Sequence, residues 1–306
     1  MGTNSERVLC VGLCNLDIVM VCPSYPLEDS DQRCISHRWQ RGGNASNSAT
    51  IFAEYGVKCE FLGTVSLDIG GQFMKKNFDE HNICTENCHY YEEFESPVST
   101  IWINSENGSR TIVHANKNMP EISYEDFSAL NLKDYSWIHF ECRPNYEPMK
   151  ANLEHIRRWN ENKANNSITV SIEVEKPSLQ QTEVLSLGDV LFISKDFAAA
   201  HGFSNMVDAV ETLSCKLRRG ATLICSWGEK GACAKSSDGP LYVSKAFPPT
   251  NVVNTLGAGD TFIAGSIISL MKGKNMQDAI IMGCKIAGTK CGMHDTKELS
   301  KLCPFL

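Results

Sequence analysis

Apolar runs and helix-like repeats alternate along most of the chain. Short apolar runs predict buried strands at residues 8–13, 60–65, 168–172, 190–194 and 221–227. Apolar residues at helical spacing predict helices at residues 45–55, 149–160, 206–217, 260–272 and 276–291. Such alternation is typical of a mostly parallel sheet with helices on both faces and right-handed crossovers. We therefore expect an α/β fold in three layers, with residues 1–306 forming one domain.

Two segments break this rhythm. Residues 19–21 and 33–39 have the composition of strands with no helix between them, and residues 90–114 contain Asn107-Gly108, a pair that favours the tight turn of an antiparallel hairpin. We expect one small antiparallel sheet, from strands at about 17–41 and 89–116, standing off the main domain. Because a sheet of a few strands cannot bury both faces by itself, it must cover a site, pair with another chain, or do both.

Composition and charge exclude several classes of protein. The chain has 306 residues, 42% of them hydrophobic, and its 29 basic and 36 acidic residues give a net charge of −7. This composition excludes a disordered chain. An acidic balance also disfavours nucleic acid as a partner, because phosphate affinity comes mainly from clustered Lys and Arg. The longest apolar stretch, residues 262–271, is about half of the roughly 20 residues that a membrane span requires.

The start of the chain and its cysteines bear on location. Residues 1–7 are polar and lack the basic start and apolar core of a secretion signal. The 14 cysteines are scattered, with no Cys-x-x-Cys pair, so we expect most to be reduced and buried. We therefore expect a cytoplasmic protein with no membrane partner.

The strongest local motif precedes the helix predicted at residues 260–272. Residues 254–261 read Asn-Thr-Leu-Gly-Ala-Gly-Asp-Thr. Small residues let the backbone approach a ligand closely, and the free N–H groups at a helix start attract anions, so this loop suits a phosphate. Local spacing leaves two roles open for Asp260: a helix cap or a catalytic base.

A second glycine cluster lies at residues 41–48, Arg-Gly-Gly-Asn-Ala-Ser-Asn-Ser. Asn44 and Asn47 are three residues apart and can direct amides, which both donate and accept hydrogen bonds, toward the hydroxyls of one ligand. The alternative is a simple turn with Asn44 capping the next helix. Asp17 is a third candidate, because it follows the first strand, where open parallel sheets bind ligands.

Together these residues resemble the ribokinase-like, PfkB-type carbohydrate kinase family. The resemblance spans nearly the whole chain and rests on the Gly-Gly-Asn cluster at 42–47 and the Thr-x-Gly-Ala-Gly-Asp block at 255–260. It implies a three-layer αβα domain with a small β lid. Further segments resemble the branch of the family that phosphorylates the C1 hydroxyl of D-fructose, at residues 25–30, 39–48, 107–113, 174–177, 194–196, 247–249 and 284–292.

The resemblance implies transfer of the γ-phosphoryl group of ATP to that hydroxyl, giving fructose 1-phosphate and ADP. Asp260 would take the hydroxyl proton, and the N–H groups of Gly257, Ala258 and Gly259 would stabilise the transferred group. The sugar would be held by Asp17, Gly43, Asn44 and Asn47. Alternatives are a related kinase acting on ribose, adenosine or the C6 hydroxyl of fructose, and a non-catalytic sugar or nucleotide sensor on the same scaffold.

The resemblance also implies a nucleotide site. Arg110 on the small sheet would reach the phosphates, and Lys195 would add positive charge beside them. Residues proposed to line the nucleotide are Trp227, Gly228, Glu229, Lys230 and Gly231, with Phe247, Pro248 and Cys291 flanking the adenine.

The family's metal element is missing. An Asn-x-x-Glu element associated with magnesium aligns with residues 194–197, which read Ser-Lys-Asp-Phe, and many members carry Asp in place of Asn254. We therefore expect no direct protein ligand for Mg²⁺, which ATP and water would hold. Glu173 and Glu175 share one strand face and could approach the ion through water, or could simply form a solvated or ion-paired strand end. K⁺ is a further candidate cofactor.

The resemblance implies a homodimer as well. The small sheets of two chains would clasp each other, with Asp29 of one chain near the sugar site of the other.

Overall fold

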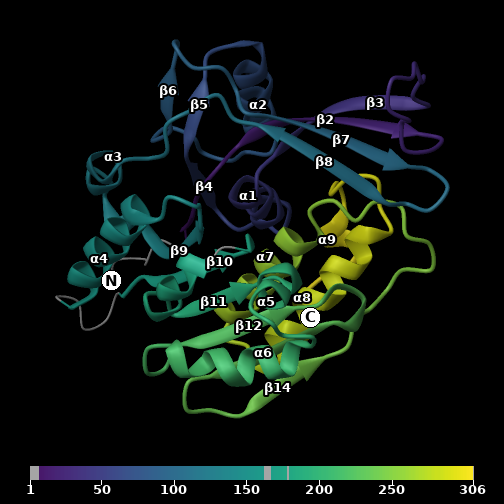
Figure 1. Cartoon of the computed structure of the whole chain (residues 1–306). Coiled ribbons are helices and arrows are strands. Elements are labelled where there is room, and N and C mark those ends of the chain that lie inside the picture. The colour runs from purple at the N-terminus through teal and green to yellow at the C-terminus, as the bar shows by residue number, and fades with distance from the viewer. Residues whose placement is uncertain (1–6, 162–166, 178, 306) are drawn as a thin grey trace.

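A central sheet of eight strands organises the chain (Figure 1). The structure, a computed structural model, describes residues 7–161, 167–177 and 179–305. The strand order is β14-β13-β12-β11-β10-β9-β1-β4, and β13 alone runs antiparallel to its neighbours. The strands are β1 (Arg7–Val11), β4 (Cys59–Leu62), β9 (Tyr135–Glu141), β10 (Thr169–Val174), β11 (Val190–Ile193), β12 (Thr222–Ser226), β13 (Ala232–Ser236) and β14 (Leu241–Ser244).

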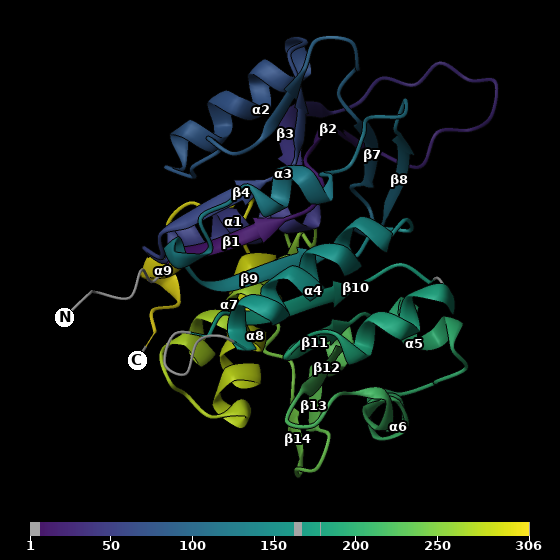
Figure 2. The same ribbon diagram turned by 90° about the vertical axis from the view of Figure 1, so that its left-hand side faces the viewer.

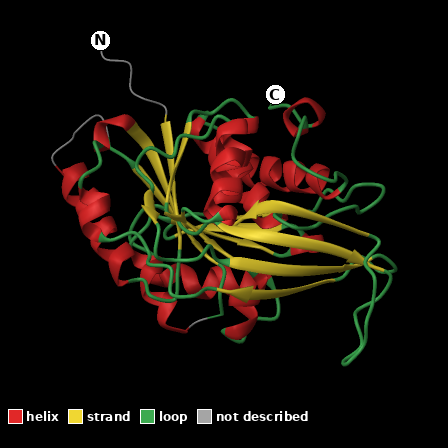
Figure 3. Ribbon diagram, turned by 90° about the horizontal axis from the view of Figure 1, so that it is seen from above, coloured by secondary structure: helices red, strands yellow, loops and turns green. Residues whose placement is uncertain are grey.

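Both faces of this sheet are apolar and covered. In β1, Leu9 and Val11 belong to the core on one face, and Val8 and Cys10 to the core on the other. Figure 3 shows the strands running between two groups of helices, which confirms the predicted three layers. One group is α3 (Tyr124–Ser128), α4 (Glu147–Glu161), α5 (Lys195–Ala200) and α6 (Met206–Leu213); the other is α1 (Asn44–Glu54), α2 (Ile69–Glu80), α7 (Ala258–Met271), α8 (Met276–Cys291) and α9 (Leu299–Leu302).

A four-stranded sheet stands off the main sheet and forms a lid (Figure 2). Its strands, in spatial order, are β3 (Ser36–Gly42), β2 (Asn15–Cys22), β7 (Val98–Asn104) and β8 (Arg110–Ala115). Residues 105–109, which include the predicted Asn107-Gly108 pair, join β7 to β8. Gly108 has a positive φ of 70° but Asn107 does not, and the N–H of Gly108 donates to the carbonyl of Asn104 at 2.8 Å, so the loop is longer than the predicted tight turn.

The strand pairing of the small sheet also differs from the prediction in two respects. The β2–β3 and β7–β8 pairings are antiparallel, as expected, but β2 and β7 pair in parallel. The chain returns through α1 and α2 before β7 begins, and this long crossover lets the two hairpins join side by side in parallel. Residues 89–91, predicted in the lid, form β6 (His89–Tyr91), which pairs instead with β5 (Thr64–Ser66).

Most element predictions hold to within a few residues. The helix predicted at 276–291 has those bounds, whereas α6 ends at Leu213 and a 3-10 turn, Ser214–Lys216, completes the amphipathic segment. The run at 60–65 breaks at Gly63 into β4 and β5.

Two further expectations concern cysteines and membranes. All fourteen cysteines are free thiols and most are buried, as expected. None of the helices in the described part of the chain has the length and apolar character needed to span a bilayer. Residues 1–6, on which the expectation of a missing secretion signal rests, lie outside the described residues.

Candidate active site

A cavity of about 900 Å³ lies under the lid, at the carboxyl ends of β9 to β12. This is the edge at which open parallel sheets bind ligands. Residues from the lid, from these strand ends and from the starts of α1 and α7 all line it. It brings together most of the predicted site residues: Asp17, Gly43, Asn44, Asn47, Arg110, Lys195, Gly228, Glu229, Gly231, Phe247, Pro248, Gly257, Ala258, Gly259, Asp260 and Cys291.

Three predicted residues lie elsewhere. Ser226 lines the cavity, and the next residue, Trp227, turns its side chain into the core with only 4% exposed. Lys230 is exposed in a 3-10 turn and does not line the cavity. Asp29 lies in the exposed loop between β2 and β3, with a φ of 59°, so its expected contact with a partner chain stays a prediction.

The loop before α7 has the backbone geometry of an anion site. Gly257 is the N-cap of α7 and has a left-handed φ of 74°, which favours glycine. A Cβ built at Gly259 would meet nothing within 4 Å, since this face of the helix start borders the open cavity. The N–H of Ala258 donates to the carbonyl of Thr255 at 3.2 Å and closes the turn. The positive end of α7 therefore points into the cavity.

Asp260 is not a helix cap. It stands three residues after the N-cap, which makes no side-chain capping bond, and its Oδ2 accepts a hydrogen bond from Nδ2 of Asn47 on α1 at 2.7 Å. Only 6% of Asp260 is exposed. Burial raises its pKa to about 8; the bond from Asn47 opposes this rise, and the carboxylates of Glu175 and Glu141 add to it. The aspartate is thus a buried carboxyl that faces a cavity.

Asn44 is not a cap either, because the N-cap of α1 is Gly43. A Cβ at Gly43 would lie 2.0 Å from the carbonyl oxygen of Leu13, and its φ is 98°, so only glycine fits there. Nδ2 of Asn44 donates to Glu173 at 3.0 Å and to Glu175 at 2.9 Å. The two asparagines of the cluster therefore face different carboxylates along the same cavity wall.

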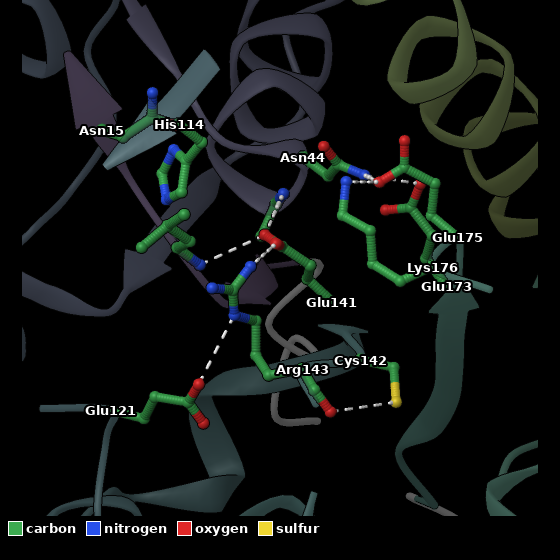
Figure 4. Close-up of polar contacts among 12 residues, drawn as sticks. Asn15, Asn44, His114, Glu121, Glu141, Cys142, Arg143, Glu173, Glu175 and Lys176 are labelled. Carbon is green, nitrogen blue, oxygen red and sulfur yellow. Dashed lines mark hydrogen bonds and ion pairs between the residues drawn. The ribbon is translucent and has the colours of Figure 1, made fainter. Parts of the chain in front are cut away.

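Carboxylates at the ends of β9 and β10 form an acidic wall (Figure 4). Oε2 of Glu141 accepts the backbone N–H groups of Leu13 at 3.1 Å and Ala45 at 3.2 Å, and its Oε1 accepts from Arg143 at 2.9 Å. Glu173 keeps one buried oxygen, Oε2, without a hydrogen-bond partner among the described residues. Burial, together with the nearby charges of Asp260 and Glu175, raises the pKa of Glu173 well above its usual value.

The lid contributes the opposite wall. Asp17 is 5% exposed, and its Oδ1 accepts from Nδ2 of Asn15 at 2.6 Å. Burial raises the pKa of Asp17, while hydrogen bonds from Asn15, Ser99 and Gln40 oppose the rise. Nη1 of Arg110 donates to Oγ1 of Thr255 at 2.7 Å. This bond joins the lid to the loop at the start of α7, residues 254–259, which we call the anion loop.

The far end of the cavity is apolar. Phe247, Pro248 and Cys291 line it with Ala287 and Gly288 of α8. A Cβ at Gly288 would lie 1.9 Å from the carbonyl oxygen of Phe247, so this glycine allows the helix to pack against that segment. The cavity therefore has one polar, charged end and one end suited to a flat apolar group.

Sequence reasoning missed three residues of this region: Glu141, Arg143 and Lys290. Glu141 ends the buried strand 135–141, and a charge directly after an apolar run is a recognisable signal at a sheet's carboxyl edge. Lys290 is 3% exposed in α8, a helix in which only six of sixteen residues are buried, and nothing in the sequence marked this lysine as one of the six.

Comparisons with known proteins agree with this arrangement. Residues 5–301 match the model of the family described as pfkB family carbohydrate kinase. Ketohexokinase from Mus musculus is 43% identical over 290 residues, which cover 94% of this chain and 97% of that protein.

Solved structures share the fold. A protein assigned as a ribokinase from Agrobacterium tumefaciens superimposes with a TM-score of 0.82 at 19% identity, covering 98% of this chain and 97% of that one. Arabidopsis thaliana ribokinase complexed with ribose and ATP has a TM-score of 0.76 at 18% identity, covering 99% and 100%. The chain belongs to the pfkB family of carbohydrate kinases and is a sugar phosphotransferase.

Proposed function

We propose that this chain has ketohexokinase activity: it transfers the γ-phosphoryl group of ATP to the C1 hydroxyl of D-fructose, giving fructose 1-phosphate and ADP. The observation that carries the proposal is the position of Asp260, a buried carboxyl at the start of α7 that also contacts Asn47 on the sugar side of the cavity. The 43% identity to a mouse ketohexokinase over nearly the full length of both chains supports the choice of sugar.

Asp260 is proposed as the base. The proton of the sugar hydroxyl passes to its carboxylate, the freed oxygen bonds to the γ-phosphorus, and the bond from that phosphorus to the bridging oxygen breaks as ADP leaves. A pKa raised to about 8 by burial suits this role, since a base works best when its pKa lies near the working pH. Gly257, Ala258 and Gly259 would stabilise the charge on the transferred group through the positive end of α7.

The two ends of the cavity suit the two substrates. Asp17, Gly43, Asn44 and Asn47 border the polar end near Asp260, where amides and a carboxylate can hold sugar hydroxyls. The remaining lining residues would bind ATP. Arg110 and Lys195 would contact its phosphates, Gly228, Glu229 and Gly231 would line the nucleotide, and Phe247, Pro248 and Cys291 would flank the adenine. The 900 Å³ cavity is large enough for both.

The described residues hold no cluster of three or more His, Cys, Asp or Glu side chains that could ligate a metal ion directly. Glu141 and Glu175 are already ion-paired, with Arg143 at 2.9 Å and Lys176 at 2.8 Å, so the acidic wall suits a magnesium ion held through water. The buried Oε2 of Glu173, which has no hydrogen-bond partner within the described residues, lies on the same wall as Glu175 and Glu141, and carboxylate oxygens are the donors that Mg²⁺ takes. Glu173 and Glu175 would hold the ion through water, one of the two roles that the sequence leaves open for them, and the bound ion would neutralise phosphate charge. A K⁺ requirement stays an expectation from the family resemblance.

The lid is proposed as a homodimer contact. All six residues of its edge strand β8 are exposed. Ile112 faces the cavity, whereas Val113 does not line it and keeps 55% of its surface exposed. The loop between β2 and β3 adds exposed Tyr25 and Leu27 near Asp29. An edge strand with exposed apolar residues is a natural site for a second chain.

The many free thiols fit the reducing cytoplasm, where we place the protein.

Product identification tests the proposed activity. Purified protein is incubated with Mg-ATP and fructose, and NMR locates the phosphate on the sugar. Fructose 1-phosphate is the expected product. Phosphate on C6, or transfer only to ribose or adenosine, would assign the chain to another kinase of the family; binding of sugar and nucleotide without any transfer would indicate a sensor.

A further inference from the structure

Lys290 contacts the anion loop on the side away from the cavity. It lies in the last turn of α8 and is 3% exposed. Its Nζ donates to the backbone carbonyl of Asn254 at 3.1 Å and to that of Leu256. Both acceptors belong to the segment that leads directly into Gly257, the N-cap of α7. The charged side chain of Lys290 thus donates to two backbone carbonyls that directly precede Gly257, where the backbone proposed to stabilise the transferred phosphoryl group begins.

Peptide geometry links these carbonyls to the cavity. In a planar trans peptide the C=O and the following N–H point in opposite directions. Because the carbonyl of Leu256 points at Lys290, the N–H of Gly257 must point the other way, and Gly257 lines the cavity. The orientation of the anion loop therefore depends on what its carbonyls bind on the far side.

The end of α8 secures the loop with backbone bonds as well. The N–H groups of Val253 and Asn254 donate to the carbonyl of Cys291 at 2.8 and 3.1 Å. The side chain of Asn254 spans the loop: its Nδ2 donates to the carbonyl of His294, and its Oδ1 accepts from the N–H of Leu256. These bonds hold residues 253–254 in place, which leaves Lys290 to orient the carbonyl of Leu256.

Burying an ammonium group costs free energy unless its N–H groups have hydrogen-bond partners or a nearby negative charge. Burial lowers the pKa of Lys290 to about 8, while the neighbouring Cys291 and Asp260 oppose the fall. The same charge opposes the rise in the pKa of Asp260. A lysine that served only to stabilise α8 would gain more by reaching solvent near the helix end.

We propose that Lys290 is a positioning residue, a tethered cation that holds the carbonyls of Asn254 and Leu256 so that the N–H of Gly257, at the positive end of α7, faces the transferring phosphoryl group. This inference rests on the proposed kinase activity. It predicts that another cation of similar size, presented to the same carbonyls, can replace the side chain.

The first test separates turnover from binding. In Lys290→Met the charge is lost at nearly constant volume, and kcat is expected to fall by about 10²-fold while the KM for fructose changes less than about twofold. The control is Lys274→Met, which removes an exposed lysine of the α7–α8 turn that does not line the cavity. Its kcat should match that of the unaltered enzyme. Equal kcat in the folded Lys290→Met variant would overturn the proposal.

The second test is chemical rescue. Lys290→Ala leaves the two carbonyls facing a space that ammonium or methylammonium can enter. We expect these ions to restore kcat by about tenfold or more, whereas tetramethylammonium, which has no N–H to donate, should restore nothing at equal ionic strength. The proposal would be overturned if tetramethylammonium restored kcat as much as ammonium and methylammonium do, or if none of the three ions restored it.

A thermal measurement makes the result independent of the sugar. Ammonium should raise the Tm of Lys290→Ala more than that of the unaltered protein or Lys274→Met, because it binds only the emptied site. If this shift occurs in a protein that does not phosphorylate fructose, the loop contact stands and the proposed function fails. If Lys290→Ala stays unfolded even with ammonium present, the lysine is structural and the proposal is wrong.

Discussion

The central strands of the main sheet and the outer strand of the lid sheet differ in how far their residues are buried. All four residues of β11 in the main sheet are buried, whereas all six residues of β8 in the lid are exposed. Helices cover both faces of the central strands of the main sheet, so these strands are buried without a ligand or a second chain. The outer part of the lid lacks such cover. Arg110 donates a hydrogen bond to Thr255, and a bound ligand or a second chain would supply further contacts.

The chemistry divides along the same line. Asp260 and Asn47 come from helices packed on the main sheet, and they already contact each other. Asp17 and Arg110 come from the lid. We infer that the main domain carries the reacting groups on rigid elements and that the lid completes binding. Substitutions in the main domain should therefore reduce turnover most, and those in the lid should mainly weaken substrate binding.

The largest effect is expected at Asp260. Asp260→Asn removes the base but keeps an oxygen that can accept from Asn47, so turnover should fall by about 10²-fold or more with little loss of ATP affinity. Steady-state kinetics and calorimetry with ATP measure the two quantities. Asp278→Asn is a matched control, because Asp278 occupies the same position in the first turn of α8. Unchanged turnover in Asp260→Asn would remove this residue from its role.

A smaller loss is expected at Arg110 on the lid. Arg110→Met removes a guanidinium that can bind phosphate oxygens, so kcat/KM for ATP should fall by about 10- to 100-fold. Thr255→Ala removes the bond between Thr255 and Arg110 but keeps the guanidinium, and should cost less. An equal loss in both variants would show that Arg110 acts by fastening the lid and not by binding phosphate.

A change of a few-fold is expected from the dimer contact. Val113 lies on the exposed edge strand and does not line the cavity, so Val113→Glu should separate the protomers in sedimentation experiments. If Asp29 completes the partner's sugar site, this variant and Asp29→Asn should both raise the KM for fructose, and only the first should change the sedimentation. A monomeric profile for the unaltered protein would contradict the proposal.

The smallest effect concerns stability and pH. The pKa of Asp260 rises from 3.8 to about 8 on folding, chiefly through burial. Between these values the folded chain holds a proton that the unfolded chain releases, so stability falls as the pH rises through this range. Asp260→Asn should flatten that dependence and raise the Tm near pH 8 by at least about 2–4 °C, with little change near pH 4. Parallel Tm–pH curves for both proteins would contradict the assignment.

Local motifs were predictable, and their contacts were less so. The glycine of the Asn107-Gly108 hairpin and the bounds of α8 follow from neighbouring residues, and both match the structure. The parallel pairing of β2 with β7 does not, because it joins segments about eighty residues apart. Trp227 was misplaced for a similar reason: a strand's alternation shows that Ser226 and Trp227 face opposite ways, but not which one faces the ligand.

The sequence by itself determined much of the alternation of strands and helices, the two glycine clusters and the family, because these depend on spacing along the chain; α2, β9, β13 and β14 were not predicted. Only the tertiary structure decided that Asp260 contacts Asn47, that Glu141 accepts from two separate backbone N–H groups, and that Lys290 lies behind the anion loop. Each of these contacts joins residues at least thirty positions apart, and their distances are set by the packing of whole helices and strands.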